Sequence, residues 1–245
     1  MRTNSEPCRN HLLCALTETE LASLAPDLEL VNLSQSEVLY EANEKLQYIY
    51  FPNTTTASLL CLLEDGVSVE VANVGNEGLI GFSAIIGRNE TLTQAIVNVE
   101  GSAYRMSIKA LRNVLARSDG RRAGKLKMLM LRYAQNLFLQ MSQFAACNRR
   151  HSTEQQLSCW LLTKFDRINS NRLIITQEAI AFLLGVRRET ITEMAKRLQN
   201  AGLIEYRRGE IDLINREQLE KNACECYQII KETWAINTED LKPRR

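Results

Sequence analysis

The stretch from Thr176 to Leu198 constrains the fold of this 245-residue chain more than any other segment. Two short helical patterns, at 176–184 and 188–201, are separated by Gly185, a residue type favoured where a chain leaves one helix and turns sharply. The second pattern has two distinct faces at helical spacing. Its apolar face contains Ile191, Met194, Ala195 and Leu198, and its polar face contains Arg188, Glu189, Thr192, Glu193 and Lys196. Two short helices joined by a glycine-containing turn predict a helix-turn-helix motif.

A hairpin pattern follows the second helix. In "LIEYRRGEIDLI", residues 203–214, apolar residues flank a tip formed by Arg207, Arg208 and Gly209. A hairpin with two arginines beside a recognition helix is typical of a wing that contacts phosphates. Arginine, glutamate and threonine can hydrogen-bond to base edges in the major groove, and residues near the N-terminal end of the second helix reach those edges. The sequence therefore predicts a winged helix-turn-helix domain that binds double-stranded DNA.

A long helix is predicted upstream of this domain. Residues 121–149 contain no proline and a single glycine, and six large residues recur at steps of three or four. These six are Leu126, Met130, Tyr133, Leu137, Met141 and Phe144. Residues 133–147 carry no charge, and Phe138 and Ala145 widen their apolar surface, so the helix is expected to be buried on more than one side. One side is expected to pack on the chain's own β-domain, and the six-residue stripe is predicted to form a dimer interface with a second copy. A monomeric core helix is the alternative.

Residues from about 30 to 106 change to a strand pattern. "GVSVEVANV" places Val67, Val69 and Val71 on one side of a ribbon and Ser68 and Glu70 on the other. "QYIYF", "SLLCLL", "AIVNV" and "SAYRM" are further short runs of this kind. Many closely spaced short strands favour an antiparallel sandwich or barrel. A helix over 10–26 is predicted before them, from a threonine and a glutamate at capping-box spacing.

Charge divides the chain into three parts. Residues 1–104 carry 4 Lys and Arg against 14 Asp and Glu, whereas residues 105–150 carry 11 Lys and Arg against a single acid. Residues 151–245 are balanced, at 15 against 14. Such asymmetry favours units with different partners, although acidic and basic solvated faces packed side by side would give the same pattern.

Several classes of protein are disfavoured by what the sequence lacks. No signal peptide opens it and no apolar run is long enough for a bilayer span, so a cytoplasmic protein without a membrane partner is expected. No P-loop, nucleophile elbow or histidine-based triad is visible, so neither an enzyme nor a cofactor is predicted.

Seven cysteines and two histidines are the candidate soft metal ligands. The odd number of cysteines argues against a disulfide framework. Only Cys224 and Cys226 are close in sequence, as C-x-C rather than C-x-x-C, so no metal site is predicted and small buried thiols are the simpler account. A redox-responsive regulator that uses Cys147 and Cys159, or Cys224 and Cys226, stays an open alternative.

The order of these parts resembles the Crp–Fnr family of bacterial transcription regulators, through "ITQEAIAFLLGVRRETITEMAKRLQNAGLI" and "LEDGVSVEVANVGNEGLIGFSAIIG". The resemblance covers about 12–230 and implies an α+β fold. The expected parts are an antiparallel β jelly-roll similar to cyclic-nucleotide-binding domains (1–118), a dimerisation helix (119–150), a winged helix-turn-helix (151–230) and a C-terminal tail (231–245). It also implies a homodimer on a two-fold operator, with RNA polymerase as a further partner.

The resemblance assigns roles to residues of the winged domain. Arg188 and Glu189 match the family's base-contacting pair, and Arg187 and Thr192 are predicted to read bases beside them. The predicted phosphate contacts are Thr176, Gln177, Lys196, Arg207 and Arg208. Glu193 departs from the family, which often has a third base-reading arginine there. Its carboxylate is expected to face a base donor or to pair with Lys196.

The predicted effector pocket departs further from the cyclic-AMP-binding members. It comprises Gly81, Phe82, Ser83, Thr93 and Gln94. Phe82 replaces the glutamate that would bind the ribose, and Thr93-Gln94 lie near the place of the Arg-Ser pair that would bind the cyclic phosphate. Without that arginine nothing offsets the desolvation of the anion. The effector is therefore expected to be absent or different from cyclic AMP. A ligand-binding adaptor whose winged domain docks protein is the alternative from another functional class.

Overall fold

The structure is a computed structural model that describes residues 9–64, 66–86, 90–116, 124–168 and 170–240. The chain forms two units. The first contains residues 1–57, 74–136 and 234–245, and the second contains residues 58–73 and 137–233. One of the divisions between the two units falls inside the long helix, between Asn136 and Leu137.

Two short capped helices begin the first unit. Helix α1 (His11–Cys14) is capped by Asn10, whose side chain accepts from the backbone of Leu12 and Leu13. Helix α2 (Glu18–Leu24) begins with the predicted capping box, and a 3-10 turn, η1 (Ala25–Asp27), follows it. The single helix predicted over 10–26 is therefore divided in two. Cys14 is disulfide-bonded, which the odd cysteine count did not predict.

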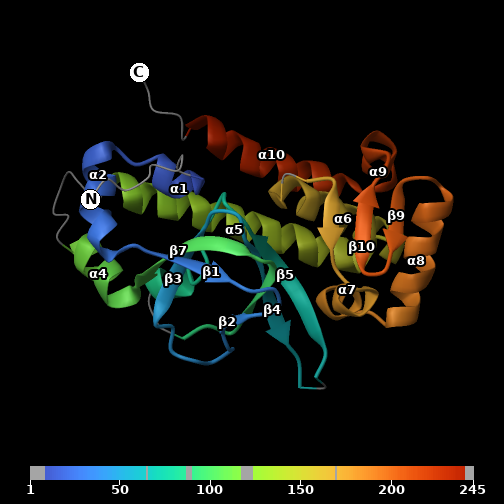
Figure 1. Cartoon of the computed structure of the whole chain (residues 1–245), viewed down its shortest axis with the longest axis horizontal. Coiled ribbons are helices and arrows are strands. Elements are labelled where there is room, and N and C mark those ends of the chain that lie inside the picture. The colour runs from blue at the N-terminus through green and yellow to red at the C-terminus, as the bar shows by residue number, and fades with distance from the viewer. Residues whose placement is uncertain (1–8, 65, 87–89, 117–123, 169, 241–245) are drawn as a thin grey trace. The chain divides into compact units, whose positions relative to one another are not determined.

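Two sheets form the β-domain. The first has the order β1 (Glu29–Leu33), β7 (Gly101–Ser107), β3 (Tyr48–Pro52), and both of its pairings are antiparallel. Its buried side chains include Ile49, Phe51 and Met106, and its three strands lie side by side in Figure 1. The second has the order β2 (Val38–Tyr40), β6 (Gln94–Val99), β4 (Thr56–Leu62), β5 (Ser68–Val74). The antiparallel β-domain is confirmed, although β1 and β2 were not singled out as separate strands.

Strand β5 has the predicted two-residue alternation but buries the opposite face. Ser68 and Glu70 are buried, whereas Val67 is 39% exposed. The physical reason lies in the second unit, where Lys164 forms an ion pair with Glu70 at 2.7 Å, both side chains being 1% exposed. A carboxylate that is paired and hydrogen-bonded can occupy a core position that would otherwise favour valine.

Helices then predominate. Helix α3 (Ser83–Ile86) and helix α4 (Ile108–Ala116) belong to the first unit. Helix α5 (Gly124–Arg150) confirms the long helix, while residues 119–123 of the predicted segment lie outside the described residues. Helix α6 (Thr153–Ile168) begins with a capping box between Ser152 and Gln155. No helix of the described chain is long and apolar enough to cross a membrane.

The second unit ends in the winged arrangement. Its elements are β8 (Arg172–Ile174), α7 (Gln177–Leu184), α8 (Arg188–Asn200), β9 (Ile204–Arg207), β10 (Glu210–Leu213) and α9 (Arg216–Asn222). Helix α10 (Glu225–Asp240) begins in the second unit and ends in the first. The sheet order is β8-β10-β9, so the predicted hairpin gains a third strand that the sequence did not indicate. Residues 231–240, predicted as a tail, continue helix α10.

Candidate nucleic-acid interface

The turn between α7 and α8 is set by two residues. Thr176 caps α7, since its hydroxyl accepts from the backbone N–H of Ala179 at 3.1 Å. Gly185 ends α7 in the left-handed region, with φ 65° and ψ 33°. A Cβ at this glycine would lie 2.7 Å from Cγ2 of Val69, so both the backbone and the available space require glycine. The geometry confirms the turn predicted from the sequence.

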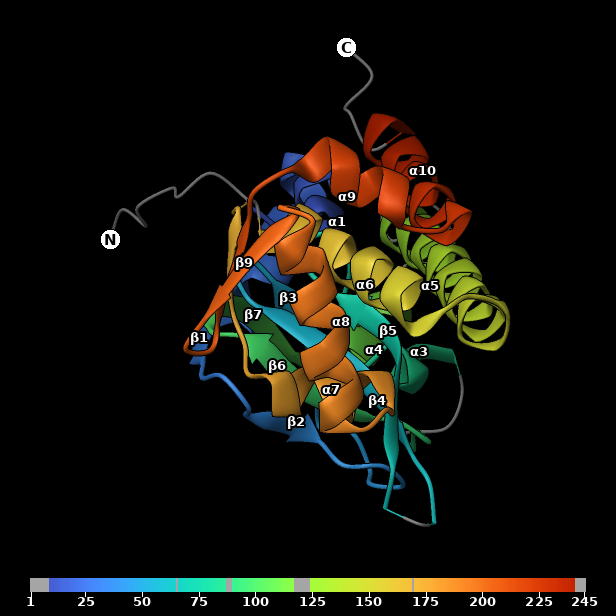
Figure 2. The same cartoon turned by 90° about the vertical axis from the view of Figure 1, so that its right-hand side faces the viewer.

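Helix α8 is amphipathic as predicted. Ile191, Met194, Ala195 and Leu198 are all buried. Its exposed residues are Arg188, Glu189, Thr192, Glu193, Lys196, Arg197, Gln199 and Asn200. The helix lies at the front of the view in Figure 2, beside α7. A helix held by one face and polar on the other can enter a groove without losing its own packing.

The N-terminal end of α8 carries exposed groups that suit an anionic or hydrogen-bonding partner. Arg187 occupies the N-cap position and makes no side-chain capping bond. It is exposed, as are Arg188 and Glu189. The first backbone N–H groups of a helix lack partners within the helix and carry a partial positive charge. Cationic side chains and backbone donors therefore share this end of the helix.

Thr192 and Gln177 contact each other. The Thr192 hydroxyl donates to Oε1 of Gln177 at 2.6 Å and lies 3.1 Å from the carbonyl oxygen of Arg188. Thr192 was predicted to read a base, and Gln177 was predicted to contact a phosphate. The hydrogen bond joins the start of α7 to the second turn of α8, so it also helps to fix the angle between the two helices.

Glu193 has a partner that was not predicted from the sequence. Its carboxylate pairs with Arg197, four residues on, at 2.6 Å rather than with Lys196. Both i+3 and i+4 positions are within reach on a helix, so the spacing alone could not decide between the two cations. Arg197 also lies 3.6 Å from Glu154 of α6. Lys196 is exposed.

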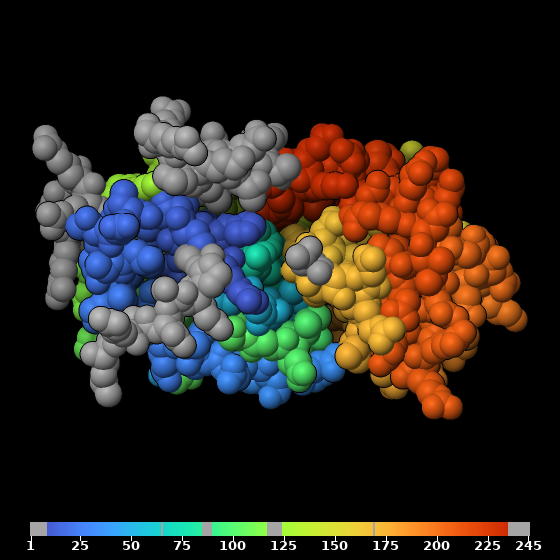
Figure 3. All heavy atoms as spheres, turned by 45° about the horizontal axis from the view of Figure 1, so that its top comes forward, coloured from blue at the N-terminus to red at the C-terminus, as the bar shows by residue number. Residues whose placement is uncertain are grey.

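The hairpin between β9 and β10 has a tight, basic tip. Arg208 and Gly209 both have positive φ, of 48° and 85°, as a two-residue type I′ turn requires. The side chain of Arg207 is 77% exposed and pairs with Glu205. The N–H of Ile175 donates to the Gly209 carbonyl at 2.7 Å, which fastens the tip beside the start of α7. Spheres of the hairpin and α8 are orange in the space-filling view (Figure 3).

One basic residue near the wing was missed. Arg172 of β8 is exposed and pairs with Asp212 at 2.8 Å. A pattern search could not have singled it out because β8 has only three residues. Because the Arg172 guanidinium is already paired with a carboxylate, it offers less net charge to a phosphate than Lys196 does.

The predicted dimer stripe on α5 needs correction. Leu126, Met130, Tyr133, Leu137 and Phe144 are each at most 9% exposed within the single chain, and Met141 is half-buried. Tyr133, for example, packs edge-to-face against Phe82, with the two ring centroids 5.8 Å apart. The exposed apolar residues lie on the other side of the helix, between about 100° and 180° from the centre of that stripe at helical spacing. They are Met128, Leu131, Phe138 and Leu139. The helix is apolar on two sides, as predicted, and the predicted stripe is the side that the chain's own residues cover.

The effector-pocket region of the first unit is occupied by its own side chains. Phe82 is buried against Tyr133, and Gly81 has φ +89°, with a position for Cβ only 3.1 Å from the Tyr48 carbonyl oxygen. Tyr40 is also buried, and burial raises the pKa of its hydroxyl. Hydrogen bonds with Thr93 and with the backbone of Gly81 lower that pKa by less.

Two polar residues of this region are also engaged. The Thr93 hydroxyl lies 2.9 Å from that of Thr91, and the Gln94 amide donates to Glu41 at 2.7 Å. Ser83 begins helix α3. In this region Phe82 therefore contacts an aromatic ring, and Gln94 contacts a carboxylate.

The cysteines named in the redox alternative lie in one group, because the thiols of Cys147 and Cys159 contact each other, as do those of Cys224 and Cys226. Sγ of Cys147 lies 3.5 Å from Sγ of Cys224, and Cys226 lies 3.5 Å from Nδ1 of His151. Residues 152–223 separate Cys147 and His151 from Cys224 and Cys226 in the sequence. Only the two short patterns C-x₃-H and C-x-C could therefore have indicated that these four residues form a cluster.

Comparisons with known proteins agree with this geometry. Residues 30–118 match the model of the cyclic nucleotide-binding domain, and residues 155–222 match that of the Crp-like helix-turn-helix domain. A comparison with curated proteins found no match.

Solved structures of the same fold are numerous. A Crp/Fnr-family transcriptional regulator from Eubacterium rectale is 17% identical with a TM-score of 0.67, over 84% of this chain and 94% of that one. FixK2 from Bradyrhizobium japonicum is 18% identical with a TM-score of 0.66, over 80% and 98%. The c-di-GMP-responsive regulator CLP from Xanthomonas campestris is 13% identical with a TM-score of 0.65, over 80% and 99%.

Proposed function

Because this chain belongs to the Crp–Fnr family of transcription regulators, we propose that it binds a two-fold DNA operator as a homodimer. Members of the family regulate transcription and are not enzymes, and the second unit contains the family's DNA-binding helix-turn-helix. One observation carries the proposal. The N-terminal end of α8 exposes Arg187, Arg188 and Glu189 while the opposite face of the helix is buried.

The base-reading set proposed is Arg187, Arg188, Glu189 and Thr192. Arginine can donate two hydrogen bonds to O6 and N7 of guanine, and glutamate can accept from N4 of cytosine. The Thr192 hydroxyl already donates a hydrogen bond to Gln177, which links α8 to α7. Its proposed contribution to base reading is therefore a contact between its methyl group and a base. Neighbouring Arg188 and Glu189 would then read a guanine and a cytosine at the mouth of the groove.

The phosphate-binding set proposed is Thr176, Gln177, Lys196, Arg207 and Arg208. Thr176 and Gln177 lie at the N-terminal end of α7, where backbone N–H groups favour an anion. The hairpin arginines lie on a rigid two-residue turn, which limits the entropy lost when they contact a phosphate. Contacts of this kind set orientation and affinity rather than sequence preference.

Homodimerisation is proposed through the exposed stripe of Met128, Leu131, Phe138 and Leu139 on α5. Phe138 is 68% exposed, which is unusual for phenylalanine in a helix without a partner. A two-fold dimer brings the same face of the helix against itself. It would also present two recognition helices to successive major grooves, about 34 Å apart on DNA. RNA polymerase is a further proposed partner, as expected of a regulator of this family.

Cyclic AMP is not the proposed effector. By the family resemblance, Phe82 replaces the carboxylate that would bind the ribose, and Gln94 lies near the place of the guanidinium that would bind the phosphate. The Glu41 carboxylate, which accepts a hydrogen bond from Gln94, would repel the phosphate. The β-domain therefore either binds a different effector or serves as a structural support.

The proposal is tested by selecting bound sequences from a random duplex pool and measuring affinity against salt. A palindromic consensus and a binding constant that falls with salt are expected. No enrichment, together with an affinity that does not change with salt, would favour the alternative in which the winged domain docks protein.

A further inference from the structure

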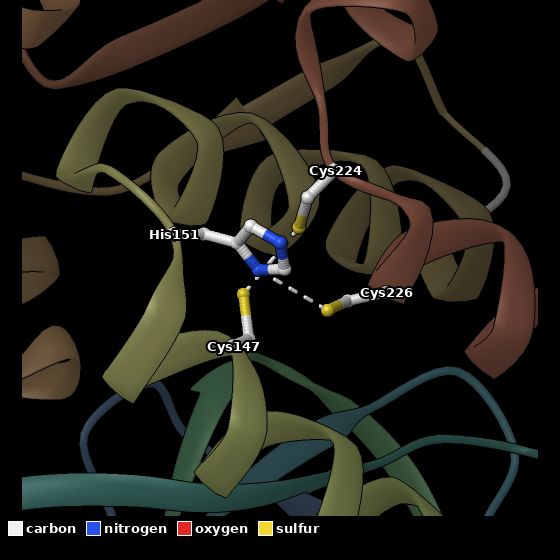
Figure 4. A group of neighbouring side chains, drawn as sticks. All are labelled: Cys147, His151, Cys224 and Cys226. Carbon is white, nitrogen blue, oxygen red and sulfur yellow. Dashed lines mark hydrogen bonds between the residues drawn. The ribbon is translucent and has the colours of Figure 1, made fainter.

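Four potential metal ligands meet where two helix junctions come together in the second unit. Cys147 lies in the last turn of α5 and His151 directly follows that helix. Cys224 precedes α10 and Cys226 lies in its first turn. We call these four residues the Cys₃His cluster. Figure 4 shows the three sulfur atoms and the imidazole ring pointing toward a common centre.

The spacing of these atoms is that of a tetrahedral zinc site. With Zn–S bonds of about 2.3 Å and a Zn–N bond of about 2.1 Å, ligand atoms at the corners of a tetrahedron are separated by about 3.6–3.8 Å. The Cys147–Cys224 sulfur pair and the Cys226–His151 pair are each separated by 3.5 Å. All four candidate ligand atoms lie within 4.8 Å of one another. Binding a metal would therefore need only small side-chain rotations.

The groups behind the ligands are also those of a metal site. Nε2 of His151 lies 3.3 Å from the carboxylate of Glu225, while Nδ1 faces the sulfur atoms. A carboxylate on one ring nitrogen directs the lone pair of the other toward a metal. The side-chain amide of Gln143 donates to Sγ of Cys226 at 3.1 Å, a contact that favours a thiolate. Both contacts come from residues outside the cluster, so they are independent of its spacing.

Burial favours a structural site over a reactive one. Cys147, Cys224 and Cys226 are at most 6% exposed. Three thiolates and one imidazole are soft ligands that suit zinc and leave no open coordination position. Such a site would join the α5–α6 junction to the start of α10. The segment that follows the wing would then be fastened to the helix that precedes the winged domain.

We propose that Cys147, His151, Cys224 and Cys226 bind one Zn²⁺ ion as a closed structural site. Binding requires only deprotonation of the three thiols, with no change of oxidation state. This proposal does not depend on the operator sequence, the effector or the dimer. A Cys147–Cys224 disulfide is the competing use of the same residues, since these two sulfur atoms lie next to each other.

The first test measures the metal content of the full-length protein purified from zinc-supplemented medium under reducing conditions. Close to one zinc per chain is expected by elemental analysis, and less than a tenth of that in Cys224→Ser and Cys226→Ser. Cys61→Ser is the matched control, because Cys61 is a half-buried free thiol outside the cluster, and it should retain zinc. Circular dichroism on each variant monitors folding. Wild-type protein without zinc, or with bound iron and its visible absorption, would overturn the proposal.

The second test replaces zinc by cobalt and does not require any variant to fold. Tetrahedral Co²⁺ with thiolate ligands gives intense ligand-field and charge-transfer bands, which are expected for the wild type. Cys226→His should keep the metal with a shifted spectrum, because imidazole can replace a thiolate. An unchanged spectrum of free Co²⁺ on addition of the wild-type protein would sink the idea, as would a Cys147–Cys224 disulfide found by mass spectrometry in freshly reduced protein.

A fifth cysteine makes the ligand assignment itself testable. Cys159 is buried and its thiol contacts those of Cys147 and Cys224, so it is the rival for the position of His151. Cys159→Ser is expected to retain zinc, and His151→Ala to weaken its retention against a chelator at least tenfold. The reverse result would show a four-cysteine site and would contradict the role given to His151.

Discussion

At the scale of single residues, Arg188 and Arg207 separate base reading from phosphate binding. Arg188 lies in the first turn of α8, whereas Arg207 lies at the hairpin tip. Arg188→Ala should cost about 1–3 kcal/mol on the selected operator and relax one position of the consensus. Arg207→Ala should weaken all duplexes alike and flatten the salt dependence by about one unit. Titration of both variants with operator and scrambled duplexes at several salt concentrations checks this. Equal, sequence-independent losses would remove the base-reading role of Arg188.

The burial of α8 was predictable at this scale, but the ion pairs on its surface were not. Helical spacing alone assigned Ile191 and Leu198 to the core, because one helix face has only one set of positions. Glu193 has a cationic residue at i+3, Lys196, and another at i+4, Arg197. In the structure its carboxylate pairs with Arg197. The free energy of such an exposed pair is small, so the sequence contains no strong signal for it.

At the scale of elements, a buried network joins the β4–β5 hairpin to α6. Besides its pair with Lys164, the Glu70 carboxylate accepts from Nε1 of Trp160 at 3.1 Å and from the Ser58 hydroxyl. Lys164→Met should lower the free energy of unfolding by about 3–5 kcal/mol, because it leaves a buried carboxylate without its cation. Glu70→Leu combined with Lys164→Met should recover part of that loss. Urea unfolding of both variants measures the difference, and a double variant less stable than Lys164→Met alone would contradict the argument.

The same network predicts a pH dependence of stability. Burial lowers the pKa of Lys164 to about 8, despite the opposing effect of Glu70. In the unfolded chain the group titrates near its ordinary value of about 10.4. Between these values the unfolded state binds more protons than the folded state, so folding stability contributed by this group rises with pH. Urea midpoints compared from pH 7.5 to 9.5 should increase for the wild type relative to the Glu70→Leu/Lys164→Met variant. Parallel profiles would show that Lys164 does not lose its proton in the folded protein.

The elements themselves were predictable to differing degrees. Long periodic segments such as 124–150 and well-capped ones such as 153–168 follow from local signals. Strand β8 has three residues and gains its stability from pairing with β10, which no local pattern reveals. The Cys₃His cluster depends in the same way on distant parts of the chain, since C-x₃-H and C-x-C become one candidate site only after the winged domain folds.

At the scale of the whole molecule, the question is how two copies associate. The sequence pattern correctly predicted that α5 has two apolar sides. It could not predict which side the chain's own residues cover, because that depends on tertiary packing. Burial assigns Leu137 to the interior, whereas Leu131 and Phe138 face outward. Charging the interior stripe would therefore unfold the protein rather than separate its copies.

The last prediction follows from that assignment. Leu131→Glu combined with Phe138→Glu should give a folded monomer, because both side chains are more than half exposed and a second copy would bring like charges together. Leu137→Glu is the matched control on the buried face, and it should lower stability sharply by placing an unpaired carboxylate in the core. Sedimentation at micromolar concentration gives the mass, and circular dichroism gives the fold. Operator affinity should fall in the monomer because each half-site is then bound separately. A wild-type protein that sediments as a monomer, or a double variant that stays dimeric, would place the self-association surface elsewhere.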